Sequence, residues 1–67
     1  MYTNLSGANL EDAKLYKANL EEANLRYADL HNADLYKDNL CGACLSVAHL
    51  ERATLNGAYL KLSLIHI

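Results

Sequence analysis

The chain of 67 residues contains no proline, phenylalanine or tryptophan, and it has three glycines. Because proline and glycine mark linkers and chain reversals, their scarcity leaves no sign of an internal domain boundary. No run of residues approaches the ~20 apolar residues that a membrane-spanning helix needs. The N-terminal stretch also lacks the basic and apolar regions of a secretory signal. We therefore expect a single domain over residues 1–67 and no membrane partner.

Cysteine and net charge are scarce as well. Cys41 and Cys44 are the only cysteines, and without a secretory signal they predict free thiols in a reducing cytoplasm. Structural zinc sites use two pairs of ligands, and here His49 is the only further ligand near the two cysteines. The formal net charge of −2 is too small to identify an acidic or a basic partner. We expect no metal and no cofactor.

Leucine and alanine, in contrast, are abundant and follow a period of five. An alanine lies two residues before most of the leucines, and Thr3 and Asp38 interrupt that column. The residue between alanine and leucine is often Asn or Asp. The leucines of this period, which we predict to form the core, are Leu5, Leu10, Leu15, Leu20, Leu25, Leu30, Leu35, Leu40, Leu45, Leu50, Leu55 and Leu60.

A period of five fits neither regular secondary structure. On an α-helix each leucine would be turned ~140° from the last, so no apolar stripe would form. On a continuous strand, successive leucines would point to opposite faces. If the chain instead turns one corner per five residues, always in the same sense, every alanine and leucine faces a common axis. The period therefore predicts an all-β solenoid.

The run GANLEDAKLYKANLEEANLRYADLHNADLYKDNL resembles the pentapeptide-repeat family, whose pattern is A(D/N)LXX. The resemblance covers residues 3–60. It implies a right-handed quadrilateral β-helix with four pentapeptides in each coil and about three coils, so that residues twenty apart stack. In that register Asp38 takes an inward position between Ala18 and Ala58, where an unpaired carboxylate is costly.

The tail, residues 61–67, abandons the repeat and has the alternation of a β-strand. Ile65 stays in the leucine register, with Ser63 as its small companion. The tail is a cap, an edge that pairs with a second chain, or a segment foreign to the repeat, and the sequence leaves these alternatives open. Solenoids need polar caps at their ends, and no capping helix is evident. We therefore expect self-association through an end.

Catalytic chemistry has no visible basis in the sequence. No serine, histidine and acid are arranged as a nucleophilic triad, and His31, His49 and His66 do not have the spacing of metal ligands. A solenoid this small also offers no obvious cleft. We expect no enzymatic activity and no small-molecule substrate.

Candidate interaction residues come from the twenty-residue register instead. Tyr16 stacks with Tyr36, and Lys17 stacks with Lys37, which gives a short aromatic and basic strip on the surface. Such a strip could engage a protein groove or a nucleic acid. Because the net charge is negative, we expect a protein partner and no direct binding of nucleic acid.

Two functions are consistent with these features. The first is a non-enzymatic scaffold or protein-interaction module. The second, implied by the resemblance, is a DNA-mimicking inhibitor of a type II topoisomerase such as gyrase. Acidic residues predominate in the first forty positions, but basic residues interrupt them. Three coils would form a rod ~15 Å tall, which imitates only about four base pairs. The first function is therefore favoured.

Overall fold

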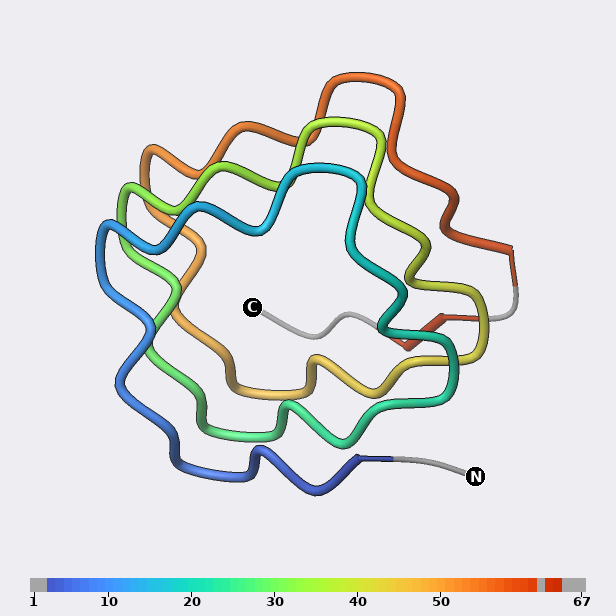
Figure 1. The fold of residues 1–67 in the computed structure, drawn as a ribbon. Coiled ribbons are helices and arrows are strands. Elements are labelled where there is room, and N and C mark those ends of the chain that lie inside the picture. Colours follow the sequence, from blue (N-terminus) through green and yellow to red (C-terminus); the bar gives the residue numbers. More distant parts are fainter. Residues whose placement is uncertain (1–2, 62, 65–67) are drawn as a thin grey trace.

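The computed structural model describes residues 3–61 and 63–64. These residues form neither a helix nor a continuous strand; each pentapeptide instead places one residue in an isolated parallel β-bridge. No helix of the described ranges is long and apolar enough to cross a membrane. Figure 1 shows the chain winding in stacked coils around one axis. Part of the tail, including Ile65 and His66, lies outside the described residues.

The bridges repeat every twenty residues, as expected for four pentapeptides in each turn. On one side of the solenoid Asn4 pairs with Asn24, Asn24 with Cys44, and Cys44 with Leu64. The other three sides show the same spacing. We refer to residues 3–22, 23–42 and 43–61 as the first, middle and last segments. Side chains one segment apart are therefore neighbours along the solenoid axis.

Each pentapeptide ends in a tight corner that follows its leucine. The corner is closed by a hydrogen bond from the backbone N–H at the alanine position to the leucine carbonyl three residues earlier, such as Ala28 to Leu25 at 3.1 Å. The second central residue has a left-handed φ, between 55° at Lys37 and 72° at Gly42. A positive φ at that position alone is the signature of a type II turn. The repeated type II turn explains how the chain bends at every fifth residue without proline.

The Asn and Asp residues before the leucines stabilise the start of these corners. Their side-chain Oδ1 accepts a hydrogen bond from the backbone N–H two residues later, for example Arg26 N–H to Asn24 Oδ1 at 3.1 Å. This is the Asx turn, which short amide and carboxylate side chains form readily. It recurs at Asn4, Asn9, Asn19, Asp29, Asp34 and Asn39. The described part of the last segment makes no such bond, because its corresponding residues are Cys44, His49, Thr54 and Tyr59.

Neighbouring segments are joined by backbone hydrogen bonds of one repeating kind. The N–H of Leu30 donates to the carbonyl of His49 at 2.8 Å, and the N–H of His49 donates to the carbonyl of Ala28 at 2.9 Å. Corner residues add a third bond, such as Lys17 N–H to the Tyr36 carbonyl at 2.8 Å. Every pentapeptide is thus tied to the one stacked above it, which fixes the register of the side chains.

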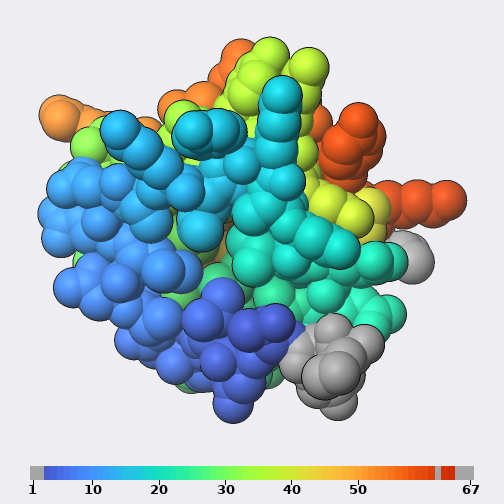
Figure 2. All heavy atoms as spheres, in the orientation of Figure 1, coloured from blue at the N-terminus to red at the C-terminus, as the bar shows by residue number. Residues whose placement is uncertain are grey.

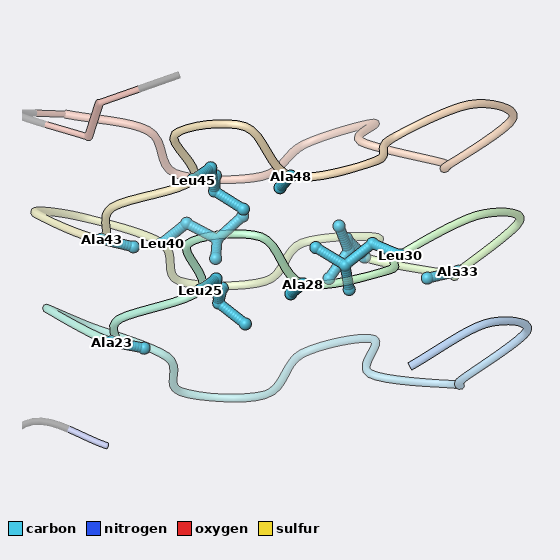
Figure 3. Close-up of a cluster of buried hydrophobic side chains, with 10 residues drawn as sticks. Ala23, Leu25, Ala28, Leu30, Ala33, Leu40, Ala43, Leu45 and Ala48 are labelled. Carbon is cyan, nitrogen blue, oxygen red and sulfur yellow. The ribbon is translucent and has the colours of Figure 1, made fainter. Parts of the chain in front are cut away.

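The core is concentrated in the middle of the solenoid. Leu25, Leu30, Leu35, Leu40 and Leu45 are completely buried. Figure 3 shows the side chains of Leu25, Leu30, Leu40 and Leu45 pointing inward together with those of neighbouring alanines. The leucines of the first segment are partly buried and pack against this core from one side, as do Leu50 and Leu55.

Leu60 departs from the predicted core. Its side chain is 37% exposed, so the prediction that it lies in the interior is wrong. The reason is its position in the last segment, where no described repeat stacks above it. The period alone predicts that a side chain points toward the axis, but burial also requires a segment on each side.

Val47 occupies a strained corner. Its φ is 60°, in the left-handed region that β-branched residues strongly avoid. Replacing Val47 with glycine should raise the free energy of unfolding by about 1 kcal/mol and the melting temperature by about 4–8 °C. Thermal denaturation followed by circular dichroism measures this shift.

The matched control for this substitution is Val47→Ala. Alanine removes the branched carbon but keeps Cβ, so it should recover only part of the gain. The side chain of Val47 is 49% exposed, and little packing is lost with it. If Val47→Gly lowered the melting temperature, the packing of the valine side chain would stabilise the fold by more than its left-handed φ destabilises it.

Candidate interaction surface

Three of the five positions in each pentapeptide point outward, and they form rows that run along the solenoid. The bridges and the bonds between segments set the spacing of these rows, so each outward side chain lies beside the one twenty residues later. The surface therefore consists of short columns of side chains spaced twenty residues apart in the sequence, and we call each such column a ladder. Its chemistry depends on which residue types share a ladder.

Two of these ladders form what we call the Tyr–Lys strip: Tyr16, Lys17, Tyr36 and Lys37. The side chains of Tyr16 and Tyr36 are 56% and 41% exposed. The two levels are joined by the hydrogen bond from Lys17 N–H to the Tyr36 carbonyl at 2.8 Å. The Nζ of Lys37 lies 5.3 Å from the ring centre of Tyr36, within the range of a cation–π contact. The structure therefore brings the four predicted residues together on one side.

The charge around the Tyr–Lys strip is positive, unlike that of the chain as a whole. Lys14 lies in the outward row next to the strip, and its backbone forms a parallel β-bridge with that of Asp34. The Oδ1 of Asp34 accepts a hydrogen bond from Tyr36 N–H at 3.1 Å. Asp34 is the only carboxylate on this side of the described chain, facing three lysines. The strip ends at Asn56, which follows Tyr36 in the ladder. A partner of this surface would therefore need acidic groups next to apolar ones.

Other exposed apolar side chains were not predicted as candidates. Tyr27 and Tyr59 are 57% and 61% exposed, and Leu64 is 58% exposed. Tyr27 stacks at a corner with Gly7 below it and Val47 above it. The five-residue register contained this signal, because it places all these residues at outward positions. Leu64 lies above Cys44 on the same side as Tyr27 and Val47, whereas Tyr59 lies above Asn39 on another side. None of them belongs to the Tyr–Lys strip.

Asp38 is the one charged residue that the described chain buries completely. It takes an alanine position in the column between Ala18 and Ala58, as predicted, and neither carboxylate oxygen has a hydrogen-bond partner. Burial raises the pKa of Asp38 from 3.8 to about 6, and the charge of Asp34 adds to this rise. No access to solvent connects this carboxyl to a substrate, so its effect is on stability.

The two cysteines are free and partly exposed. Cys41 is the first central residue of the corner between Leu40 and Ala43, and Cys44 follows that corner. The Cys44 thiol donates a hydrogen bond to Ser46 Oγ at 3.5 Å. Hydrogen bonding from Ser46 stabilises the thiolate and lowers the pKa of Cys44. Within residues 3–61 and 63–64, no three His, Cys, Asp or Glu side chains converge closely enough to hold a metal ion.

The imidazoles of His31 and His49 lie near each other on a different side. They line a shallow hollow together with Glu11, Asp29 and Glu51. The closest charged contact joins His49 Nδ1 and Glu51 Oε2 at 3.9 Å, and both side chains are more than 60% exposed. A pair this exposed contributes little to stability. The stacking of His31 between Glu11 and Glu51 follows from the twenty-residue register.

The repeat geometry agrees with a comparison to known families. A family model described as pentapeptide repeats, in eight copies, matches residues 3–37. The chain belongs to the pentapeptide-repeat family. The matched region contains the Tyr–Lys strip and every Asx turn except the one at Asn39. The last segment, in which Cys44, His49, Thr54 and Tyr59 replace the Asn and Asp residues, lies beyond it.

Solved structures of pentapeptide-repeat proteins are similar to this one. The protein Rfr23 from the cyanobacterium Cyanothece 51142 is 41% identical, with a TM-score of 0.45; the match covers 96% of this chain and 44% of that protein. The protein alr5209 from Nostoc PCC 7120 is 32% identical, with a TM-score of 0.43, and coverage of 88% and 65%.

A third similar structure is QnrB1, a plasmid-mediated fluoroquinolone resistance protein. It is 22% identical with a TM-score of 0.32, and the match covers 96% of this chain and 38% of QnrB1. This pentapeptide-repeat chain therefore spans less than two thirds of the length of each of the three. A search among curated proteins gave no match.

Proposed function

We propose that this chain is a non-enzymatic, cytoplasmic pentapeptide-repeat module that binds an acidic segment of a protein partner through the Tyr–Lys strip. In this proposal the chain forms a right-handed quadrilateral β-helix of about three coils. The observation that carries the function is the exposure of Tyr16 and Tyr36 in one ladder with two lysines beside them.

Rigidity favours binding by this surface. The strip is built on backbone held by hydrogen bonds of 2.8 Å between segments, and the tyrosine rings have few rotatable bonds. A surface that is already ordered loses little entropy when a partner binds. Tyrosine is also enriched among the residues that contribute most to protein interfaces.

Charge selects the kind of partner. Lys14, Lys17 and Lys37 surround the two tyrosines, while the whole chain has a net charge of −2. An acidic segment with an apolar anchor would therefore be attracted to this side and repelled by the two sides that carry most of the carboxylates, those of Glu11 and of Glu21. The attraction between exposed charges should weaken as salt is added.

Size argues against the alternative of a DNA mimic. The Cα extents of the described residues are 25 × 23 × 19 Å. Even the longest of these corresponds to only about seven base pairs at ~3.4 Å each. The lysines of the strip also interrupt any acidic surface that would resemble a DNA backbone.

The binding test uses a library of acidic peptides with a single apolar anchor, measured by fluorescence anisotropy. Tyr36→Ala should weaken the best peptide about tenfold or more, as for a central interface residue. Lys37→Gly should also weaken it, although glycine suits the left-handed corner and should not lower stability. Weaker binding by a variant that is as stable as the wild type separates recognition from unfolding.

Tyr27→Ala is the matched control, because Tyr27 is also exposed, at 57% compared with 41% for Tyr36, but lies outside the strip. It should leave the peptide affinity unchanged. Equal loss with Tyr27→Ala, or no binding by any acidic peptide, would contradict the proposal. Binding of single-stranded DNA instead would identify a nucleic-acid surface, and inhibition of gyrase supercoiling by the wild-type protein would favour the DNA mimic.

A further inference from the structure

Asn56 adjoins the Tyr–Lys strip, in the corner that follows Leu55. A hydrogen bond from Ala58 N–H to the Leu55 carbonyl at 3.1 Å closes this corner, and the Asn56 carbonyl accepts a hydrogen bond from Lys37 N–H at 2.9 Å. Asn56 and the next residue, Gly57, are both exposed. Figure 2 shows, at the top of the view, cyan and yellow-green atoms of the first and middle segments next to orange atoms of the last segment.

The side chain of Asn56 differs from those of the other asparagines in its contacts. Asn32 donates from Nδ2 to Asp12 Oδ1 at 2.7 Å. The rest accept a hydrogen bond from the backbone N–H two residues later, and they are Asn4, Asn9, Asn19, Asn24 and Asn39. Within residues 3–61 and 63–64, no hydrogen bond engages the side chain of Asn56. Its amide carbon is therefore free to turn toward the backbone of the next residue.

The residue that follows Asn56 sets it apart as well. Asn56 is the only asparagine followed by glycine, whereas Asn32 is followed by alanine and the others by leucine. Asparagine is chemically labile because the backbone nitrogen of the next residue can attack its amide carbon. A side chain on that next residue hinders the attack, and glycine has none and moves most freely. The sequence and the contacts therefore identify the same residue.

We propose that Asn56 is a site of spontaneous deamidation and that the product adds a negative charge to the Tyr–Lys strip. The Gly57 nitrogen loses its proton to water and forms a bond to Cγ of Asn56. The side-chain nitrogen takes up a proton and leaves as ammonia, so that a cyclic succinimide remains. One water molecule then opens the ring. Cleavage of the new bond gives aspartate, and cleavage of the original peptide bond gives isoaspartate.

Lys37 lies beside the corner in which this reaction takes place. A β-carbon on Gly57 would lie 3.1 Å from Cγ of Lys37, so the lysine side chain passes over the glycine. The Nζ of the same lysine lies 5.3 Å from the ring centre of Tyr36. A carboxylate at position 56 therefore forms next to both groups and should weaken the attraction of an acidic segment. This effect on binding rests on the proposed function, whereas the chemistry at Asn56 does not.

The two products differ in their effect on the corner. Aspartate keeps the backbone unchanged, so the hydrogen bond from Lys37 N–H to the carbonyl of residue 56 stays in place. Isoaspartate inserts the β-carbon into the main chain and displaces that carbonyl from Lys37. The aspartate form therefore isolates the effect of the added charge, and the substitution Asn56→Asp reproduces it.

Prolonged incubation of the full chain at neutral and at mildly alkaline pH tests the chemistry. Peptide mapping by mass spectrometry should find the first conversion at Asn56, and it should be faster at the higher pH because the attacking nitrogen must lose its proton. Asn32, which is also exposed, is the internal comparison. Asn56→Gln is the matched control, since its longer amide would need a larger ring and should stay unconverted. Earlier conversion of another asparagine, or an unchanged Asn56 while a short peptide of the same local sequence is converted, would overturn the proposed site.

Fluorescence anisotropy with the acidic peptide that the wild type binds best tests the effect on the strip. Asn56→Asp should raise the dissociation constant about two- to fivefold, as expected for one exposed charge, and added salt should reduce the difference. Asn56→Gln should bind as the wild type does. Equal or tighter binding by Asn56→Asp would overturn the effect on the strip. A wild type that binds no acidic peptide would overturn that effect together with the proposed function, whereas mass spectrometry would still decide the conversion of Asn56.

Discussion

Replacing Asp38 with alanine should raise the free energy of unfolding at pH 7 by about 3 kcal/mol, since a rise in pKa from 3.8 to about 6 corresponds to a penalty of that size. The carboxylate is completely buried and neither oxygen has a partner. Alanine is the residue that the repeat places at this position, so the substitution leaves no unusual cavity. The melting temperature should rise by at least about 10 °C.

The pH dependence of this gain has a defined sign. Because the pKa of Asp38 is higher in the folded than in the unfolded state, folding binds a proton, and the wild type gains stability as the pH falls from about 6 to 3.8. The advantage of Asp38→Ala should therefore be largest above pH 6 and should shrink through that interval. A smaller advantage should persist in acid, because the neutral carboxyl also lacks partners. Urea denaturation of the wild type and of Asp38→Ala at a series of pH values measures how this advantage changes with pH and how much of it remains in acid.

The control for Asp38→Ala is Asp29→Asn. This substitution also removes one negative charge, but the amide can still accept the hydrogen bond that the carboxylate accepts from His31 N–H at 3.0 Å. It should change the free energy of unfolding by less than about 0.5 kcal/mol. If Asp38→Ala lowered stability, Asp38 would have a structural partner that the present contacts do not show.

The column that contains Asp38 shows how much the sequence alone predicts. The five-residue period was sufficient to place Asp38 inward and the Tyr–Lys strip outward, because inward and outward positions follow from one corner per repeat. Stacking at twenty residues did not follow from the period. It required the resemblance to the pentapeptide-repeat family, since three or five repeats per coil would use the same period.

Other features depended on the three-dimensional structure. The left-handed φ of Val47 was not visible in the sequence, because glycine occupies that corner position only at Gly7, Gly42 and Gly57, and other residue types elsewhere. The contact of Lys37 with the Tyr36 ring also required coordinates. The exposure of Leu60 was missed because a periodic pattern treats all repeats alike, whereas burial depends on the number of neighbouring segments.

This dependence of burial on position gives the second large effect. Leu35→Ala removes a completely buried side chain from the middle segment and should cost about 2–5 kcal/mol. Leu15 lies below it in the same column and is partly buried, so Leu15→Ala should cost about half as much. A domain of this size is stable by only about 3–5 kcal/mol, and Leu35→Ala should therefore lose most of its stability at 25 °C.

Both leucine substitutions are best measured in the Asp38→Ala background, where the added stability keeps Leu35→Ala within the range of urea denaturation. Both substitutions remove the same atoms. The difference between the two losses in free energy of unfolding therefore measures how much the second stacked segment adds to the burial of Leu35. Equal losses would contradict the gradient of burial along the solenoid. A small loss from Leu35→Ala would contradict the more basic premise that the leucines of the repeat line one interior.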